Sequence, residues 1–466
     1  MLKKKITRTF LYKKIKILAI ITSISGIRGT IGGRVGESLS PIDVVKYSAA
    51  YGTWIIRHTD TENEKPKVII GRDARISGEM VSQFVVGTLQ SLGIDVVDLG
   101  LATTPTVEMA VMFEEANGGI ILSASHNPKH WNALKLLNGK GEFISAADGN
   151  IILQLAKNDD FTFAEVTDLG SYRKDDSYLK KHIDAILALH LVDVEAIKKR
   201  DFKIVVDGIN SVGSFAVPAL LEALGVQEIV VINGEANGHF AHNPEPLPQN
   251  LATVSNEVKR EEADLAFVVD PDVDRLAIVC ENGDMFGEEY TLVAVADYVL
   301  QNRQGNTVSN LSSTRALDDI TKKRCRNHKY YSSAVGEVNV VAKMKEVDAV
   351  IGGEGNGGII VPELHYGRDA LVGIALFLSH LAHSGRSCSL LRSKYPDYTI
   401  VKNKIELTPD IDVDAILQQL KEKYKRYPMS TIDGVRIEFD GDWVHLRRSN
   451  TEPIIRIYAE SSTAAT

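Results

Sequence analysis

The 466-residue chain has little cysteine, no excess of positive charge and no long apolar run. Cys280, Cys325 and Cys388 are odd in number and form no Cys-x-x-Cys pair, which indicates reduced thiols in a cytoplasmic protein rather than a disulfide framework. No segment approaches the ~18 to 20 apolar residues that a membrane span requires. The formal net charge of −8 argues against general affinity for nucleic acid.

The first sixteen residues differ from this average, because they carry seven Lys or Arg and no acidic residue. The apolar run 17–21 that follows is short for the core of a signal peptide. It also continues directly into Ser25 and Arg28, so that cleavage after it would remove the first strand and a candidate site residue. We therefore predict that residues 1–20 form a disordered basic extension.

A length of 466 residues with 44% hydrophobic residues is enough for about three domains, each with its own core. A strand–helix–strand pattern repeats from residues 67 and 203, and a less regular copy begins near Thr307. Such repeats predict parallel sheets covered by helices, with ligands at the strand ends. Residues 411–425 are amphipathic and 435–446 have the pattern of a hairpin, which predicts a smaller α+β domain at the C-terminus.

The apolar run 120–122 ends in Ser-Ala-Ser-His-Asn-Pro, residues 123–128. A turn of this kind at a strand end presents the hydroxyl of Ser125 among polar partners, as a nucleophile requires. Ser and Asn before Pro are also ordinary turn residues, and by itself the segment predicts only a loop. Three polar segments downstream favour the nucleophile.

Asp270, Asp272 and Asp274 alternate between two strand-like runs. Three carboxylates without His or Cys nearby are typical ligands of a hard cation such as Mg²⁺. Arg275 stands where an EF-hand loop needs glycine, so this is not an EF-hand. Solvated aspartates are the alternative, but like charges so close together repel one another unless a cation binds.

A glycine-rich loop at residues 352–358 follows another strand-like run and contains Glu354 and Asn356. A phosphate-binding loop would not include a carboxylate, whereas sugar hydroxyls donate well to one. The loop is therefore predicted to hold hydroxyls, with a flexible turn as the alternative.

The fourth polar segment begins at Arg447 and is rich in hydrogen-bond donors. A solvated hairpin turn, the alternative, explains so many donors poorly. Guanidinium, hydroxyl and amide groups gathered in one loop are suited to a phosphate dianion. The candidate residues are Arg447, Ser449, Asn450, Thr451 and Arg456.

These four motifs resemble those of the α-D-phosphohexomutases. Ser-Ala-Ser-His-Asn-Pro with Asn132 and Lys135, then Asp-x-Asp-x-Asp-Arg, Gly-Glu-Gly-Asn-Gly-Gly and Arg-x-Ser-Asn-Thr-Glu-Pro, occur in that family's order. The resemblance covers roughly residues 21 to 461. The third motif and the opening Ile24-Ser-Gly-Ile-Arg-Gly-Thr30 look most like a bacterial phosphoglucosamine mutase subgroup shared with archaeal-type enzymes.

The resemblance implies an α/β fold with three similar mixed or parallel-sheet α/β domains and a smaller C-terminal α+β domain. We place these domains at 21–168, 169–284, 285–388 and 389–466. They carry the phosphoserine, metal, sugar and phosphate loops, in that order.

The resemblance also implies a mechanism in which Ser125 is carried as phosphoserine, a group of about −2 charge. Mg²⁺ would bind Ser125 together with Asp270, Asp272 and Asp274 and offset the repulsion between them. The phosphoryl group passes to a hexose monophosphate, and the other phosphate of the resulting bisphosphate returns to Ser125. Glucose or glucosamine 1,6-bisphosphate would be the activator.

Substrate-binding roles follow from the same resemblance. Glu354 and Asn356 would hold hydroxyls common to both orientations of the sugar, and Arg275 would also contact substrate. The phosphate that does not react would bind Arg447, Ser449, Asn450, Thr451 and Arg456.

Proton transfer has three candidates by the family pattern, Lys135, His126 and Arg28. Many phosphohexomutases have an acid-base His at the end of the sugar loop, but this chain has Gly358 there. Lys135 is therefore the leading candidate, provided that burial or the nearby Arg28 and Arg275 lower its pKa. His126 could instead serve only as a hydrogen-bond donor.

The sequence leaves several functions open. The first is conversion of glucosamine 6-phosphate to glucosamine 1-phosphate by a cytoplasmic monomer or homodimer, and the second is a phosphoglucomutase/phosphomannomutase. A Mg²⁺-dependent phosphatase of the haloacid dehalogenase type would use Asp270 as nucleophile, but it would want Thr or Val at position 274. An inactive sugar-phosphate binder would follow if Gly358 or the end of the chain at Thr466 abolishes turnover.

Overall fold

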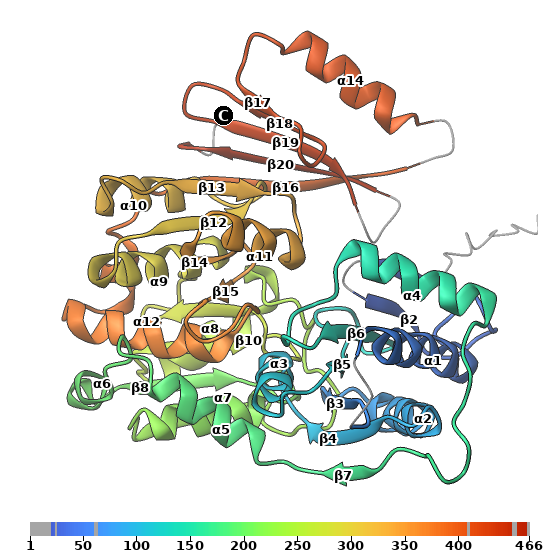
Figure 1. Ribbon diagram of the computed structural model, residues 1–466. Coiled ribbons are helices and arrows are strands. Elements are labelled where there is room, and N and C mark those ends of the chain that lie inside the picture. Colours follow the sequence, from blue (N-terminus) through green and yellow to red (C-terminus); the bar gives the residue numbers. More distant parts are fainter. Residues whose placement is uncertain (1–19, 24–25, 60–63, 408–410, 450–453, 464–466) are drawn as a thin grey trace, which may run out of the picture.

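The computed structural model describes residues 20–463 apart from 24–25, 60–63, 408–410 and 450–453 (Figure 1). The predicted basic extension, except for Ile20, lies outside the described residues. The described chain forms four units, and each is built around a sheet of its own.

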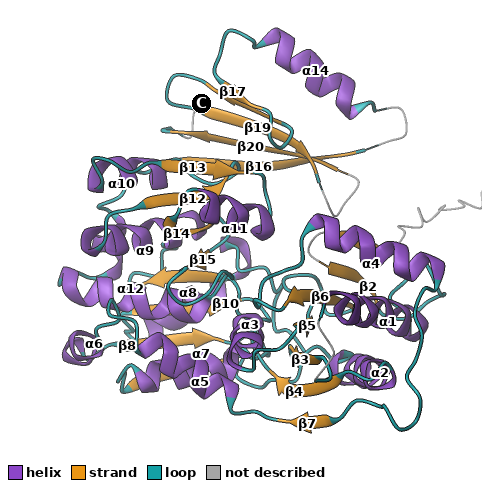
Figure 2. Ribbon diagram, viewed as in Figure 1, coloured by secondary structure: helices purple, strands orange, loops and turns teal. Residues whose placement is uncertain are grey.

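Unit I contains a seven-stranded mixed sheet with the order β1-β2-β6-β5-β3-β4-β7. Helices α1, α2 and α4 cover one face and α3 the other (Figure 2). Strand β7, which follows the predicted boundary at residue 168, extends the sheet beside β4. The elements are β1 (Ile20–Ser23), β2 (Gly26–Thr30), α1 (Pro41–His58), β3 (Lys67–Arg72), α2 (Gly78–Ser91), β4 (Asp95–Leu101), α3 (Thr104–Phe113), β5 (Gly118–Leu122), β6 (Trp131–Asn138), α4 (Ala146–Asn158) and β7 (Tyr172–Lys174).

Local sequence explains where the helices of unit I begin. Ser40 and Asp43 form a capping box at α1, and Pro41 occupies the first turn, where its missing N–H has no cost. Every residue of β5 is buried, as expected for a strand covered on both faces. This strand leads directly into the segment that contains Ser125.

Unit II has a four-stranded sheet with the order β11-β10-β8-β9. Strands β10 and β11 are antiparallel and pair Val269 with Leu276, so the loop 270–275 closes a hairpin at the strand ends. The elements are α5 (Tyr178–Leu187), α6 (Val194–Arg200), β8 (Lys203–Asp207), α7 (Gly213–Ala223), β9 (Glu228–Ile232), η1 (Pro248–Asn250), α8 (Ala252–Arg260), β10 (Leu265–Val269) and β11 (Leu276–Cys280).

Unit III has the strand order β13-β12-β14-β15. One apolar core runs through units II and III, because helix α12 packs against α5, α6 and α7 as well as α9. The elements are α9 (Glu288–Asn302), β12 (Asn306–Asn310), α10 (Ala316–Arg324), β13 (Tyr330–Ser333), α11 (Glu337–Glu346), β14 (Ala349–Glu354), β15 (Gly358–Ile360), α12 (Ala370–Ser384) and α13 (Cys388–Arg392).

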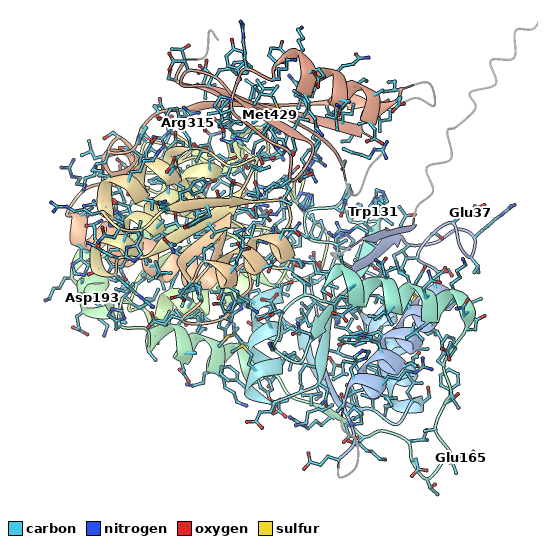
Figure 3. All side chains as sticks on the ribbon, turned by 45° about the horizontal axis from the view of Figure 1, so that its top comes forward. Glu37, Trp131, Glu165, Asp193, Arg315 and Met429 are labelled. Carbon is cyan, nitrogen blue, oxygen red and sulfur yellow. The ribbon has the colours of Figure 1, made fainter. Side chains whose placement is uncertain are left out.

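Unit IV is a five-stranded antiparallel sheet with one helix, drawn in red at the top of Figure 1. It rests on unit III: Arg436 Nη1 donates to the carbonyl of Leu311 at 2.7 Å, and Arg315 lies at the junction (Figure 3) 3.1 Å from Glu438. The elements are β16 (Thr399–Glu406), α14 (Val413–Lys423), β17 (Met429–Ser430), β18 (Val435–Glu438), β19 (Trp443–Arg448) and β20 (Ile454–Ser461).

The predicted fold class is confirmed. The three sequence repeats are β3-α2-β4, β8-α7-β9 and β12-α10-β13, each with parallel neighbouring strands. The predicted hairpin is the antiparallel pair β18–β19. The domain boundaries at 168, 284 and 388 stay a proposal. None of the helices in the described part of the chain combines the length and apolar character that a bilayer crossing requires.

Candidate active site

The Asp270–Arg275 loop closes the β10–β11 hairpin and buries all three aspartates completely. Asp270 Oδ1 accepts the backbone N–H groups of Asp274 and Arg275, each at 3.1 Å, which folds the loop back on itself. Val273 has a φ of 63°, a strained value for a β-branched residue. The strain allows side chains on both sides of Val273 to point into one place.

Ser125 lies against this loop, although unit I carries it. Its Oγ donates to Asp270 Oδ2 at 2.6 Å, and its backbone N–H donates to Ser123 Oγ at 2.9 Å. The φ of Ser125 is 48°, which turns the hydroxyl out of the line of β5 towards unit II. The structure thus brings the first two sequence motifs into contact.

Arg75, which the sequence analysis missed, holds the Ser125 loop in this shape. Its guanidinium is buried and pairs with Asp73 at 3.0 Å. It donates to the carbonyls of Ser125 at 2.5 Å and Asn127 at 2.6 Å, and also to those of Pro128 and Trp131. The run Gly-Arg-Asp-Ala-Arg after β3 was the available signal, but nothing in it shows which carbonyls the arginine reaches.

The three aspartates fit a divalent cation. Each offers a carboxylate oxygen within 4.8 Å of the other two. Within the described residues, Asp272 Oδ1 and Asp274 Oδ1 are buried and accept no hydrogen bond. Burial and the charges of Asp274 and Asp272 raise the pKa of Asp270 well above its usual range. A hard cation would supply the missing partner for both orphaned oxygens and relieve this repulsion.

Lys135 projects from β6 towards the same aspartates. Its Nζ lies 2.5 Å from Asp272 Oδ2 and 3.3 Å from Asp274 Oδ2. Burial alone would lower its pKa, but these two carboxylates raise it above the ordinary lysine value. The condition set for Lys135 as a proton carrier, a lowered pKa, is therefore not met by its surroundings in this structure. Thr104, which the sequence analysis also missed, donates to Asp272 Oδ2 at 2.6 Å.

The other two proton-transfer candidates flank Ser125. His126 Nδ1 lies 3.3 Å from Ser125 Oγ, and Arg28 Nη1 donates to Asn127 Oδ1 at 3.1 Å. Burial, helped by Arg275 and Arg28, lowers the pKa of His126 well below its usual value, so its ring is neutral near pH 7. Burial and Arg275 lower the pKa of Arg28 to about 10.

The sugar loop joins β14 to β15, and Glu354 is almost fully occupied. Its Oε1 accepts from Asn310 Nδ2 at 2.7 Å and from the backbone N–H of Gly336 at 3.1 Å. Its Oε2 lies 2.8 Å from Arg368 Nη1 and 3.5 Å from Asn356 Nδ2. Arg368 was not predicted from the sequence, although Asp369 after it is a signal for the start of a helix.

The candidate phosphate-binding residues belong to unit IV. Arg447 Nε pairs with Asp433 Oδ2 at 2.9 Å, and Arg456 Nε lies 3.5 Å from Ser449 Oγ. Asn450 and Thr451 lie outside the described residues. Asp433 also accepts the backbone N–H of Val335 at 3.0 Å, which links this part of unit IV to unit III.

A second group with metal-ligand chemistry lies between units I, II and III. His182, His365 and Asp369 are buried and close enough to share an ion. Asp369 Oδ2 lies 2.9 Å from His182 Nε2 and 3.3 Å from His365 Nε2, while its Oδ1 caps α12. Hydrogen bonding and capping account for these contacts, and we assign no metal there.

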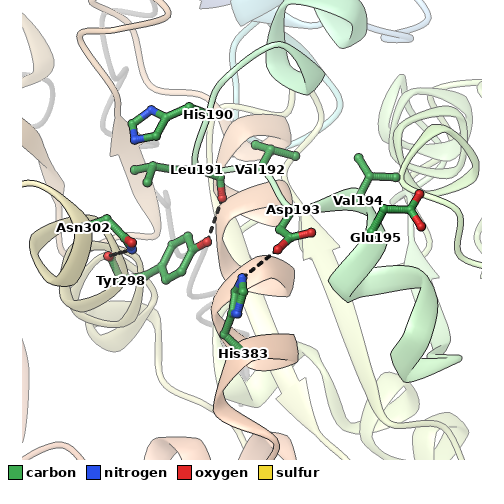
Figure 4. A pocket seen from close by; sticks show the side chains of 9 residues that line it. All are labelled: His190, Leu191, Val192, Asp193, Val194, Glu195, Tyr298, Asn302 and His383. Carbon is green, nitrogen blue, oxygen red and sulfur yellow. Dashed lines mark hydrogen bonds and ion pairs between the residues drawn. The ribbon is translucent and has the colours of Figure 1, made fainter.

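A cavity of about 470 Å³ opens elsewhere, between the segment before α6 and helices α9 and α12 (Figure 4). Its polar groups pair with each other: His383 lies 3.0 Å from Asp193, and Tyr298 donates to the carbonyl of Leu191 at 2.8 Å. Its described lining contains no Lys or Arg. This cavity therefore lacks the charge that a sugar phosphate requires.

Family models of phosphoglucomutase/phosphomannomutase match nearly the whole chain. The α/β/α domains I, II and III match residues 20–163, 180–283 and 287–398, and the C-terminal domain matches 401–466. The order of these matches is the order of the four units.

Relatives of similar length agree with this match. A phosphoglucomutase/phosphomannomutase of Thermococcus kodakarensis is 38% identical over 440 residues, covering 93% of this chain and 94% of that protein. A phosphoglucosamine/phosphogalactosamine mutase of Sulfurisphaera tokodaii is 33% identical, covering 94% of each. The crystal structure of a phosphoglucomutase/phosphomannomutase family protein from Burkholderia thailandensis superposes with a TM-score of 0.81 at 25% identity, covering 96% of this chain and 94% of that one. The chain therefore belongs to the phosphoglucomutase/phosphomannomutase family of the α-D-phosphohexomutase superfamily and is an intramolecular phosphotransferase.

Proposed function

We propose that this enzyme moves a phosphoryl group between the 6- and 1-positions of a hexose through a phosphoserine at Ser125 and a bisphosphate intermediate. The observation that carries the proposal is the 2.6 Å contact between Ser125 Oγ and Asp270, beside the two orphaned oxygens of Asp272 and Asp274. A hydroxyl placed beside a cation site is arranged for phosphoryl transfer.

When bound at the three aspartates, Mg²⁺ would neutralise charge and polarise the phosphoryl group. Arg28, Lys135 and Arg275 lie beside these aspartates and add positive charge that would attract the transferred phosphate. The sugar oxygen that forms the new P–O bond loses a proton, and Ser125 Oγ gains one when its own P–O bond breaks. His126, whose Nδ1 lies 3.3 Å from Ser125 Oγ, and Lys135, beside Asp272, are the groups that we propose for these proton transfers.

Turnover requires the bisphosphate to reverse its orientation, and glucose 1,6-bisphosphate would supply this intermediate as activator. Glu354 and Asn356 would hold hydroxyls in both orientations. Arg447, Ser449 and Arg456 would bind the phosphate that is not reacting, together with Asn450 and Thr451. The reacting groups thus come from units I and II and the sugar-binding groups from units III and IV.

Glucose and mannose phosphates are the sugars that we propose first. Arg368 pairs with Glu354 at 2.8 Å, which reduces the attraction that this carboxylate would offer an ammonium group at C2. The name of the relative at 38% identity supports the same choice. Glucosamine 6-phosphate, the sugar predicted first from the sequence, is the second candidate, supported by the names of relatives at 31% and 33% identity.

The test is a comparison of initial rates on glucose 1-phosphate, mannose 1-phosphate and glucosamine 6-phosphate with Mg²⁺ and catalytic glucose 1,6-bisphosphate, followed by ³¹P NMR. We expect isomer without free phosphate, and the highest rate on glucose or mannose phosphate. A faster reaction of glucosamine 6-phosphate would reverse the order of sugars. Free phosphate in place of isomer would contradict the mutase.

A further inference from the structure

Arg368 connects the loop that carries the aspartates to the loop that carries Glu354. It is largely buried, and its guanidinium contacts three carboxylates from three different elements. Nη2 lies 2.8 Å from Asp274 Oδ2, and Nη1 lies 2.8 Å from Glu354 Oε2. Nε lies 3.0 Å from Glu337 Oε2, at the first turn of α11. Only a planar fork with several donors can reach all three groups at once.

The side chain of Arg368 also occupies the space beside Gly358. A Cβ added at Gly358 would lie 2.4 Å from Arg368 Cδ and 3.1 Å from its Cγ. A side chain at position 358 and the observed Arg368 conformation therefore exclude each other. The space that a side chain at position 358 would occupy is filled in this structure by Arg368.

Neighbouring residues fix the direction of Arg368. Asp369 caps α12 and contacts His182 of α5 and His365, four residues earlier in the same loop. On the other side, Gly367 packs so closely against Glu108 that an added Cβ would lie 1.8 Å from Glu108 Oε2. The backbone on both sides of Arg368 is thus held by units I and II while the side chain faces the site.

We propose that Arg368 is a positioning residue that couples the metal loop to the sugar loop. This inference rests on the proposed function. Arg368 pairs with Glu354 and holds its carboxylate in the orientation that would accept sugar hydroxyls. It also pairs with Asp274 Oδ2, so this candidate ligand atom would be less available to a cation and metal binding would be weaker. Its removal therefore has two effects of opposite sign, looser sugar recognition and tighter metal binding.

The predicted effect on metal binding is tested by direct binding of Mn²⁺, measured by electron paramagnetic resonance without substrate. For Arg368→Met we expect a Kd about three- to tenfold lower than wild type, because a cation beside Asp274 is lost. The matched control is Arg324→Met, which breaks the 2.6 Å pair with Asp297 in the same unit, away from both loops. An unchanged or higher Kd in Arg368→Met would overturn the proposal, as would an equal change in Arg324→Met.

The predicted effect on sugar recognition is tested by kcat/KM on glucose 1-phosphate. The variants are Arg368→Met, Glu354→Gln and the double variant. Each single variant should lose about 10- to 100-fold, mostly in KM, and the double variant no more than the worse single variant. If the loss in the double variant equals the product of the two single losses, Arg368 acts independently of Glu354, which contradicts the proposal.

Gly358→Ala provides a second route, because it displaces Arg368 without removing its charge. Gly358→Ala should lower kcat/KM, as Arg368→Met does. If Arg368→Met does not fold, Gly358→Ala replaces it in both assays. Wild-type levels in both assays for Gly358→Ala would contradict the assigned packing. If wild-type protein shows no mutase activity at all, the proposed function fails, while the Mn²⁺ measurements still decide the role of Arg368.

Discussion

Ser125 Oγ lies 2.6 Å from Asp270 Oδ2, although the two residues are 145 positions apart in the sequence. The contact places a hydroxyl of unit I on the carboxylate cluster of unit II. Asp270 has its pKa raised by burial and by Asp274 and Asp272, so negative charge in this place is not fully compensated. A phosphoryl group on Ser125 would add to that charge. A divalent cation is therefore central to the account.

Metal binding should stabilise the folded protein. We expect Mg²⁺ to raise the melting temperature of wild type, with a gain of about 2.7 kcal/mol at a concentration of 100 times Kd. Asp272→Asn should reduce the shift, because one ligand with an orphaned oxygen is lost. Differential scanning calorimetry with and without chelator measures this. An equal shift in wild type and Asp272→Asn would place the metal elsewhere.

Arg75→Met should be strongly destabilising. Its loss leaves Asp73 buried and unpaired and removes four carbonyl hydrogen bonds from the Ser125 loop. We expect the free energy of unfolding to fall by about 3 to 5 kcal/mol in urea titrations. The control Arg57→Met breaks an exposed pair with Asp160 and should change the free energy of unfolding far less than Arg75→Met. Equal costs would show that the Arg75 network contributes little.

The four motifs and the fold class were predictable because each depends on residues close together in the sequence. Patterns such as alternating aspartates, a glycine-rich loop and strand–helix–strand repeats can be interpreted without knowing any tertiary contact. Arg75 and Arg368 were not predictable, since their partners lie on other elements: Arg368 is 94 residues from Asp274. An isolated arginine beside an aspartate carries no signal of such partners.

Stability should fall as the pH rises from about 6.5 towards 10. Burial alone would lower the pKa of His365, but its hydrogen bond to Asp369 and the carboxylate of Glu108, 3.3 Å from Nδ1, raise it to about 10. Burial also raises the pKa of Glu108 to about 8. Both groups bind protons more tightly in the folded state than in the unfolded chain, so their contributions are present at low pH and are lost as the pH rises through these pKa values.

Glu108→Gln isolates this effect. The variant removes the Glu108 carboxyl, whose pKa is raised from 4.5 to about 8, and with it one of the two carboxylates that raise the pKa of His365. Its unfolding free energy, measured in urea from pH 6 to 9.5, should therefore depend less steeply on pH than that of wild type. A slope as steep as in wild type would show that other groups control the pH dependence.

The pKa of Lys135 shows where local sequence reasoning fails. From the sequence, Lys135 could carry a proton only if burial or the nearby Arg28 and Arg275 lowered its pKa. In the structure Asp272 approaches Nζ from a residue 137 positions away and reverses the sign. Only the packing of unit II against unit I determines which charge lies closer.

The most direct test of the central claim is to follow a phosphoryl group onto and off Ser125. Wild type and Ser125→Ala would be incubated with glucose 1,6-bisphosphate and Mg²⁺, and the phosphate located by peptide mass spectrometry. The account predicts phosphate on Ser125 of wild type and its transfer to added glucose 1-phosphate, with no mutase turnover by Ser125→Ala. Phosphate on another residue, or full turnover by Ser125→Ala, would contradict it.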